Sequence, residues 1–415
     1  MHEFYNQVSY FTKNFYLKNY DIIIIGAGII GLSAAYKLLE KNSSLQICIL
    51  EKENTVAFHQ TGHNSGVIHS GIYYKPGSLK AINCITGYKM LLDFCDENKI
   101  TYDICGKIIV ATEEKELTSL QTLFDRGNAN GLSGTKIISK EEIKEFEPHA
   151  TGIKGIFVPQ TGIVDYKLVS KKIAELIKNK GAEINFGEEV LDIKIDGNEI
   201  NVKTPKENYV SKVVISCAGL YSDKIAEMTN TKTDFRIIPF RGEYYKLRDS
   251  AKHLVKNLIY PVPDPEFPFL GVHFTKRIDG MIEAGPNAVL ALRKEGYKKT
   301  DFDLSELVDT LSYKGFRKVA AKYWKTGFYE MYRSFSKNEF VKSLQRLIPS
   351  IRSEDVVEGG SGVRAQACDS KGKLIDDFLI IENEKVINIC NAPSPAATSC
   401  LSIGDTIAEK VLRII

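Results

Sequence analysis

The first fifty residues combine two apolar runs with one helical segment. Residues 21–25 (DIIII) are continuously apolar after the aspartate, and residues 46–50 (QICIL) are apolar after the glutamine. Such runs are typical of parallel strands that are buried on both faces, because a half-exposed strand would show a polar residue at every second position. Residues 32–41 lie between the two runs and predict a helix. The pattern therefore predicts a strand, a helix and a second strand at the start of the fold.

A glycine-rich turn, GAGIIG at residues 26–31, joins the first strand to this helix. Gly26 permits a tight turn, Gly28 lets a pyrophosphate approach the backbone, and Gly31 lets the helix lie close to the strand. The helix N-terminus would offer free N–H groups to the diphosphate. Glu51 follows the second strand, where an acid accepts hydrogen bonds from ribose hydroxyls and disfavours a 2′-phosphate. These features predict binding of FAD or NAD rather than NADP.

Later segments predict a second kind of sheet. Residues 242–247, 258–261, 270–275 and 281–284 are short strand-like segments separated by proline and glycine, as expected for antiparallel strands. Residues 386–390 (VINIC), the turn NAPSPAATS and residues 400–412 predict a final strand, turn and helix. The positive end of this helix would point toward a bound cofactor.

Composition and charge narrow the class of protein. Of the 415 residues, 43% are hydrophobic and 26% are charged, which is ordinary for a globular protein. The 55 basic and 52 acidic residues leave a net charge of +3, so no global field for nucleic acid is expected. The eight cysteines form no C-x-x-C pair, so we expect buried free thiols and no metal site. No apolar run approaches the roughly 18 residues that cross a bilayer. Residues 1–19 are interpreted as a poorly specified extension, with an organelle presequence as the alternative.

The loop after Glu51 distinguishes FAD from NAD, because its sequence resembles that of known flavoproteins. Residues 59–69, HQTGHNSGVIH, resemble the D-amino acid oxidase-like flavoproteins, and in particular the L-2-hydroxyglutarate oxidase/dehydrogenase family. In such proteins this loop runs past the pyrophosphate to the flavin ring. An NAD enzyme has no need for cofactor contacts near residues 60, 220 and 395 together, so FAD is the expected cofactor. Besides Gly26, Gly28, Gly31 and Glu51, the expected cofactor-binding residues are Lys52, Thr61, His63, Asn64, Ser65, Gly66, Val190, Ala218, Gly219, Ser394, Pro395, Ala397 and Thr398.

The resemblance runs from about residue 20 to the C-terminus, through strings such as PFRGEYYKL, YPVPDPEFPFLGVHF and GVRAQACD. It implies an α/β fold in which a Rossmann-like FAD-binding domain is interleaved with an α+β substrate domain built on an antiparallel sheet. We expect the FAD-binding domain at residues 20–83, 150–235 and 355–415, and the substrate-binding domain at 84–149 and 236–354. The extension at 1–19 and Cys400 depart from the family's pattern.

A 2-hydroxy dicarboxylate needs cations for its carboxylates, a base for its hydroxyl proton, and its C2 hydrogen held over flavin N5. Arginine suits carboxylates, and the resemblance places Arg364 close to flavin and substrate. Arg241 is a second candidate whose motif serves equally to orient the backbone. Neutral imidazole can accept the hydroxyl proton, so His63 and His273 are candidate bases. The reserve candidates are His59 and His69, with Tyr73 and Tyr260 as hydrogen-bond donors.

Residues 313–335 mix lysines and arginines with aromatic side chains, including Trp324. An amphipathic helix of this composition suits a membrane surface. The alternative is a helix that packs on the substrate domain and exposes a solvated basic face.

Together these expectations indicate FAD-dependent oxidation of L-2-hydroxyglutarate to 2-oxoglutarate, with electrons passed to a quinone or to oxygen. The alternatives are an amino-acid or amine oxidase of the same superfamily, and an NAD-binding or noncatalytic flavin-binding module. No nucleic-acid partner is expected. The expected location is the cytoplasm, with peripheral attachment to the inner face of the membrane, or the mitochondrion in a eukaryotic source.

Overall fold

The computed structural model describes residues 18–264 and 269–415. Most of the expected extension, together with its presequence alternative, lies outside the described residues. The first strand, β1, begins at Lys18, so the last two residues of the expected extension belong to the fold. Lys18 is paired there with Tyr209 of the neighbouring strand.

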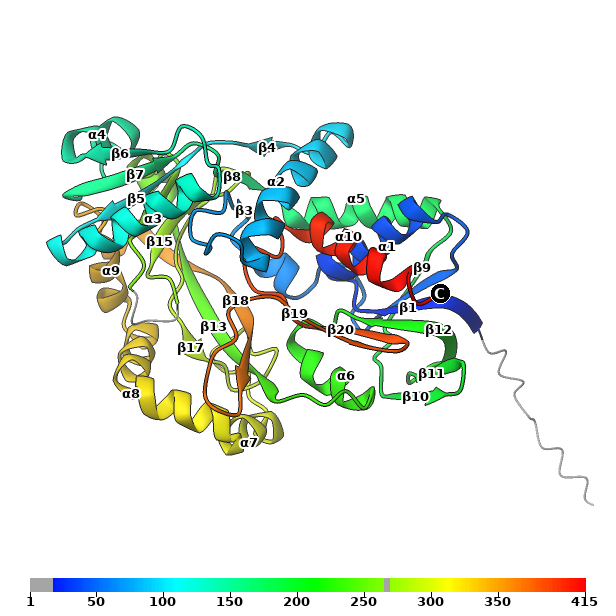
Figure 1. Cartoon of the computed structure of the whole chain (residues 1–415). Helices are drawn as coiled ribbons and strands as arrows, with labels where there is room; N and C mark the ends of the chain where they lie inside the picture. Colours follow the sequence, from blue (N-terminus) through cyan, green and yellow to red (C-terminus); the bar gives the residue numbers. More distant parts are fainter. Residues whose placement is uncertain (1–17, 265–268) are drawn as a thin grey trace, which may run out of the picture.

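A mainly parallel sheet forms one half of the molecule, on the right of Figure 1. Its strand order is β10-β11-β12-β1-β2-β9, and β20 joins β12 on the same sheet and carries β19. The pairs β1–β2, β1–β12, β2–β9 and β12–β20 are parallel. Its strands in the described residues are β1 (Lys18–Ile25), β2 (Ile47–Glu51), β9 (Glu183–Phe186), β10 (Asp192–Asp196), β11 (Glu199–Lys203), β12 (Asn208–Ser216), β19 (Leu379–Asn383) and β20 (Val386–Asn391). The predicted strands at 21–25, 46–50 and 386–390 are confirmed.

Three helices cover one face of this sheet: α1 (Ile29–Lys41), α5 (Tyr166–Asn179) and α10 (Cys400–Val411) (Figure 1). Ile22 and Ile24 of β1 are buried against them in one core, whereas Ile23 and Ile25 are buried in a second core on the opposite face. Burial of both faces accounts for the unbroken apolar run in the sequence. Helix α1 begins three residues earlier than predicted, because Gly28 already serves as its N-cap.

A nine-stranded sheet forms the other half and has the order β17-β13-β16-β15-β14-β5-β7-β6, with β18 paired to β13. Strands β13 and β18 are antiparallel over almost their whole length. The predicted antiparallel strands are confirmed as β13, β14, β15 and β16. Within the described residues the strands of this sheet are β5 (Lys107–Ala111), β6 (Lys136–Ser139), β7 (Lys154–Val158), β13 (Phe235–Leu247), β14 (Leu258–Pro261), β15 (His273–Lys276), β16 (Ile282–Gly285), β17 (Val289–Leu290) and β18 (Val356–Asp369).

The remaining elements complete the covering of the two sheets. A small sheet consists of β3 (Val67–Ile68), β8 (Gly162–Val164) and β4 (Tyr102–Asp103). The other helices are α2 (Leu79–Glu97), α3 (Leu117–Ala129), α4 (Lys140–Phe146), α6 (Ser222–Met228), α7 (Leu304–Ser312), α8 (Lys314–Phe335) and α9 (Lys337–Gln345). Helices α7 and α8 lie at one end of the nine-stranded half, at the bottom of Figure 1.

Two strands of the nine-stranded sheet come from segments that the sequence assigned to the FAD-binding domain. Strand β7 pairs with β5, and β18 pairs with β13. A strand belongs to the sheet with which it forms backbone hydrogen bonds, even when the segments next to it in the sequence belong to the other half. The division of the chain into two interleaved domains at the expected boundaries stays a prediction.

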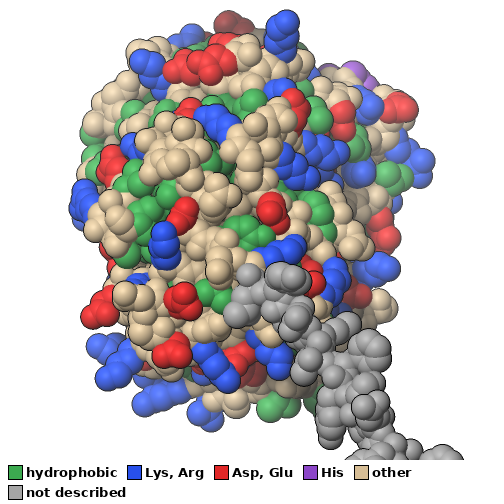
Figure 2. All heavy atoms as spheres, turned by 90° about the vertical axis from the view of Figure 1, so that its right-hand side faces the viewer, with side chains coloured by type: hydrophobic (Ala, Val, Ile, Leu, Met, Phe, Trp, Pro, Cys, Tyr) green, Lys and Arg blue, Asp and Glu red, His purple; other side chains and the backbone are tan. Residues whose placement is uncertain are grey.

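The end of the molecule that carries the parallel sheet has a mixed surface charge. Figure 2 shows lysine and arginine side chains interspersed with aspartate and glutamate over this face. Among the described residues, no helix combines the length and apolar character required to cross a membrane.

Candidate active site

A cavity of about 1040 Å³ contains residues of both halves in its wall. Distant parts of the chain contribute to the wall, among them the glycine turn, the loop after β2, the turn after β12, the middle of β18, and the turn before α10. The volume is at the upper end for small-molecule sites, which suits a dinucleotide together with a small substrate.

The glycine turn has the shape of a pyrophosphate cradle. Gly26 has a φ of +101°, which other residues rarely adopt, and a Cβ at Gly31 would lie 2.1 Å from the Gly26 carbonyl oxygen. A Cβ at Gly28 would meet only Thr61 Oγ1, at 3.6 Å. Gly31 therefore serves the packing of the helix on the strand, whereas the space above Gly28 is left open by the protein. This difference matches the roles that the fingerprint assigns.

Glu51 lies at the end of β2 and lines the same cavity. Its two carboxylate oxygens accept hydrogen bonds from Ala27 N at 2.7 Å and from Glu53 N at 2.9 Å. Each oxygen keeps a second lone pair, so both remain able to accept a ribose hydroxyl. Lys52 lies 2.6 Å from both Glu53 and Glu295, and its ammonium therefore occupies the acidic cluster that these residues form with His59.

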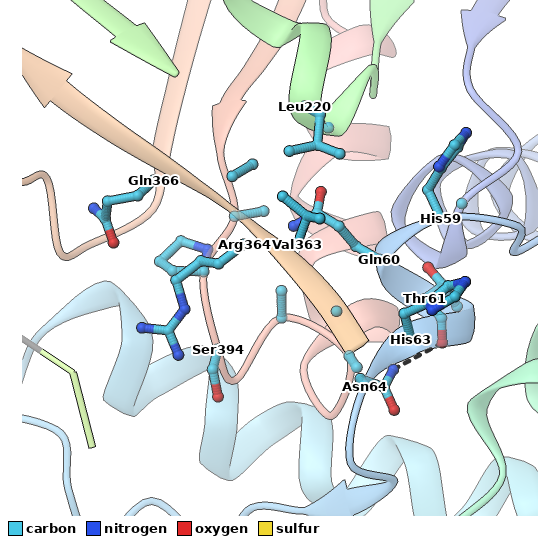
Figure 3. A pocket seen from close by; sticks show the side chains of 18 of the residues that line it. His59, Gln60, Thr61, His63, Asn64, Leu220, Val363, Arg364, Gln366 and Ser394 are labelled. Atoms are coloured by element: carbon cyan, nitrogen blue, oxygen red, sulfur yellow. Dashed lines mark hydrogen bonds between the residues drawn. The ribbon is translucent and has the colours of Figure 1, made fainter. Parts of the chain in front are cut away.

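The loop after β2 is held against α1 and β18. Thr61 Oγ1 accepts a hydrogen bond from Ile29 N at 3.1 Å, and Asn64 closes the turn by bonding to Thr61 O and Gly66 N. His63 Nδ1 donates to the Ser361 carbonyl at 2.8 Å, so Nε2 is left as the acceptor. Figure 3 shows Thr61, His63 and His59 gathered on one side of β18, with Arg364 extending on the other side near Ser394.

Nearly all of the expected cofactor residues line the cavity. The exceptions are Gly31, which packs α1 on β1, and Thr398. Thr398 is buried behind the wall, where its hydroxyl accepts from His69 N at 3.0 Å and bonds to the Tyr166 hydroxyl at 2.9 Å. Thr398 therefore holds the wall in place rather than facing the cavity.

The two candidate arginines differ in their surroundings. Arg241 is 5% exposed and is engaged by Glu243 at 3.0 Å and by the carbonyls of Gly296 and Lys298. Arg364 is open to the cavity, and its guanidinium lies 5.1 Å from the Phe269 ring. Within residues 18–264 and 269–415, no hydrogen bond or ion pair of Arg364 is present. Arg364 is therefore available for a carboxylate, whereas Arg241 orients the backbone around residues 296–298.

His273 has the tautomer that a base requires. Its Nδ1 donates to the Gly271 carbonyl at 2.9 Å, so Nε2 carries the free lone pair, and its ring stacks on Tyr260 at 4.0 Å. Burial lowers the pKa of His273 to about 4, because the charged imidazolium is poorly solvated there. Burial also lowers the pKa of His63. Both imidazoles are therefore neutral near pH 7.

The sequence analysis missed several polar and aromatic groups of this site. Tyr74, Lys80 and Tyr244 line the cavity, and Lys107 lies against the rings of Tyr73 and Tyr260. A usable signal was present only for Lys107, since it opens an otherwise apolar strand, KIIVA, that is entirely buried. The others lie in a helix or next to aromatic residues, where their chemistry has no local signature.

Comparison with known proteins agrees with this geometry. The family described as FAD dependent oxidoreductase matches residues 21–410. An L-2-hydroxyglutarate dehydrogenase of Indibacter alkaliphilus is 54% identical over 396 residues, covering 95% of this chain and 99% of the relative. The mitochondrial L-2-hydroxyglutarate dehydrogenase of Homo sapiens is 45% identical, covering 95% of this chain and 89% of the relative.

The fold likewise matches solved structures. The FAD-bound L-alpha-glycerophosphate oxidase of Mycoplasma pneumoniae has a TM-score of 0.78 at 24% identity, covering 96% of this chain and 95% of the other. An open space above Gly28, a helix N-terminus behind it and an acid at the end of β2 fit FAD. The chain belongs to the FAD-dependent oxidoreductase family.

Proposed function

We propose that this protein oxidises L-2-hydroxyglutarate to 2-oxoglutarate. The observation that carries the proposal is the 54% identity to a dehydrogenase of that name over nearly the full length of both chains. The site supports it, because two neutral histidines line one cavity together with Arg364, which has no hydrogen bond or ion pair among the described residues. FAD, when bound, supplies the two-electron acceptor for the hydrogen on C2.

The residues of the cavity would share the remaining tasks. Arg364 would bind a substrate carboxylate through its forked donors and so fix the orientation of C2. The hydroxyl proton would move to an imidazole Nε2 as the C2 hydrogen leaves with its bonding electrons, which yields the 2-oxo acid. We assign this proton to His273, because its Nδ1 is fixed by Gly271 and Tyr260 holds its ring. His63 is the second candidate for the base.

Anaerobic reduction of the holoenzyme tests this function. The purified protein should show the visible absorbance of oxidised flavin, and L-2-hydroxyglutarate should bleach it. A panel should include D-2-hydroxyglutarate, other 2-hydroxy acids, and L- and D-amino acids, because an amino-acid oxidase of the same superfamily is the alternative. Bleaching by an amino acid but by no hydroxy acid would reject the proposal. A protein without flavin absorbance would point to an NAD-binding module.

The electron acceptor is proposed to be a quinone, with oxygen as the alternative. Reoxidation of the reduced enzyme by a soluble ubiquinone analogue should then be faster than reoxidation by dissolved oxygen. Measuring both rates on the same reduced preparation separates the two acceptors, since the first half-reaction is shared.

A membrane contact through residues 313–335, which comprise α8 and the residue before it, would bring the enzyme to a quinone. Helix α8 packs on the protein through Gly315, Phe316 and Val319, yet its outer side is aromatic, with Phe328 72% and Phe335 73% exposed. Exposed lysines at 318, 322 and 325 lie on the same helix. Aromatic side chains flanked by cations suit an anionic lipid surface. We propose that this surface rests on the inner face of the membrane.

A further inference from the structure

Three polar groups at or directly behind one part of the cavity wall have no hydrogen-bond partner for the atom concerned among the described residues. Tyr73 Oη and His69 Nδ1 are buried without a hydrogen bond in the described part of the chain, although both residues line the cavity. Next to them, the side chain of Lys107 is 1% exposed, and its ammonium lies 4.4 Å from the Tyr73 ring centre and 4.9 Å from that of Tyr260. Buried polar groups normally have partners, so such a cluster requires an explanation.

The Lys107 ammonium differs from the other lysine of this region. Lys80 lines the cavity, whereas Lys107 lies behind the wall, and the Lys80 ammonium lies 2.7 Å from the Asp376 carboxylate and is neutralised by it. Over residues 18–264 and 269–415, Lys107 makes no hydrogen bond or ion pair, and only the faces of two tyrosine rings contact its charge. Cation–π contact compensates only part of the cost of burying an ammonium. An anion delivered from the cavity would complete the compensation.

We infer that Tyr73, His69 and Lys107 form a second carboxylate subsite, which takes the carboxylate of the substrate that Arg364 does not bind. Tyr73 Oη and His69 Nδ1 would donate hydrogen bonds, with Ser394 Oγ, 3.1 Å from His69 Nε2, donating to that nitrogen. Lys107 acts from behind the tyrosine rings as a positioning residue that supplies the charge. The inference rests on the proposed function, and it makes this subsite the reason for selecting a dicarboxylate.

The charge of Lys107 would depend on whether a carboxylate is bound in the subsite. Burial lowers the pKa of Lys107 to about 7, and a bound carboxylate would raise it again. The titratable groups that face Lys107 are Tyr73, Tyr260, His69, His273 and Cys84. Burial raises the pKa values of the tyrosines and the thiol and lowers those of the histidines, so none of these five groups titrates near pH 8. Binding of a dicarboxylate at pH 8 should therefore take up a proton at Lys107.

Binding of glutarate and pentanoate to the oxidised holoenzyme tests the subsite. The two ligands have equal length, but pentanoate carries a methyl group in place of the second carboxylate. Titration calorimetry in two buffers of different ionisation enthalpy gives both affinity and proton uptake. The wild-type protein should prefer glutarate by about tenfold or more and take up a proton at pH 8. Lys107→Met should lose the preference and the proton uptake, and Tyr73→Phe should lose part of the preference, whereas Arg364→Met should weaken both ligands.

Two variants serve as controls for the lysine. Lys154→Met makes the same substitution at an exposed position of the neighbouring strand β7, and it should change neither quantity. Lys80→Met removes a lysine that lines the cavity and is paired with Asp376. The inference is wrong if the Lys107→Met protein still prefers glutarate over pentanoate. It is also wrong if the preference is lost in Lys80→Met and not in Lys107→Met.

Thermal unfolding of the holoenzyme without an added carboxylate ligand distinguishes this role from a structural one. The pKa of Lys107 in the folded state, about 7, lies below the ordinary value of 10.5, so the buried charge destabilises the fold fully below pH 7 and not at all above pH 10.5. Lys107→Met should therefore raise Tm at pH 6, and the gain should vanish as pH rises toward 10.5. A lower Tm at pH 6 would make Lys107 a structural residue and overturn the inference.

The function and the subsite can fail separately. If glutarate binds as expected but L-2-hydroxyglutarate does not bleach the flavin, the proposed oxidation is wrong and the subsite stands. If L-2-hydroxyglutarate bleaches the flavin but Lys107→Met keeps the preference for glutarate, the subsite is wrong and the oxidation stands.

Discussion

Arg364 is the residue on which substrate binding should depend most directly. Its guanidinium faces the cavity without a hydrogen bond or ion pair in the described part of the chain, and the neighbouring Phe269 ring contacts it without neutralising it. Arg364→Met keeps much of the side-chain volume and removes the forked donors, so kcat/KM for L-2-hydroxyglutarate should fall by about a hundredfold or more. Lys at this position should recover only part of the loss. Near wild-type kcat/KM with full flavin occupancy would remove Arg364 from the substrate site.

The low pKa of His273 predicts how activity should depend on pH. Only the neutral imidazole can accept the hydroxyl proton, and burial lowers the pKa of His273 to about 4. Activity that depends on this base should therefore be constant from pH 7 down to about 5 and fall only as pH approaches 4. An ordinary exposed histidine would instead give a loss of kcat/KM centred near pH 6.5. A profile with that midpoint, abolished by His273→Gln, would show that the imidazole is solvated in the working enzyme.

The role of a single residue could be predicted from the sequence where a motif fixes the local backbone. It was harder to predict where the fold brings distant side chains together. Gly26, Gly28 and Glu51 were found from spacing, because the turn and strand that carry them are local. The resemblance placed Arg364 before Arg241, but the engagement of Arg241 could not be predicted, since it depends on tertiary contacts with Glu243 and two carbonyls. A lysine such as Lys107 has no sequence signature beyond its place in an apolar strand.

The positions of the strands were predicted better than the pairing of one strand with another. Continuous apolar runs located β1, β2 and β20 within a few residues, because burial on both faces imposes a visible pattern, whereas proline and glycine punctuation located β14. The pairing of β18 with β13 joins residues more than a hundred positions apart, and no local pattern specifies it. This pairing positions the site, since β18 holds Ser361 against His63 and presents Arg364 to the cavity.

The turn between β1 and α1 gives a matched pair of variants. Gly28 has φ −72°, which any residue can adopt, and its missing Cβ faces open space, so Gly28→Val should fold normally and lose FAD. Gly31→Val places a side chain 2.1 Å from a backbone carbonyl and should destabilise the protein by several kcal/mol or prevent folding. Flavin absorbance and Tm separate the two outcomes. A Gly28→Val protein with a normal flavin complement would disprove this cofactor site.

The proposed membrane surface, residues 313–335, lies on helix α8 of the nine-stranded half, next to α7. Leu304, Trp324 and Phe328 are each exposed over more than half of their surface, and clusters of exposed large apolar side chains mark sites of contact with a membrane or another protein. Replacing Lys318, Lys322 and Lys325 with Gln should release the protein from vesicles containing anionic lipid at low salt, because each lysine near such a surface contributes about 1 kcal/mol. Activity with a soluble dye should stay unchanged, since these lysines do not line the cavity.

A control variant that loses three lysines elsewhere on the protein tests whether vesicle binding depends on where the lysines lie. Lys171, Lys178 and Lys180 are exposed on or directly after α5, in the half that carries the parallel sheet. If binding followed net charge alone, replacing these three with Gln would release the protein from vesicles equally well. We expect this control to stay bound, because the aromatic side chains of α8 would still enter the lipid headgroups beside their own lysines. The further variant Trp324→Ser, Phe328→Ser should be released even with all lysines present. Equal vesicle binding by wild type, the α8 lysine variant and the aromatic variant would leave α8 as a helix that packs on the protein with a solvated outer face.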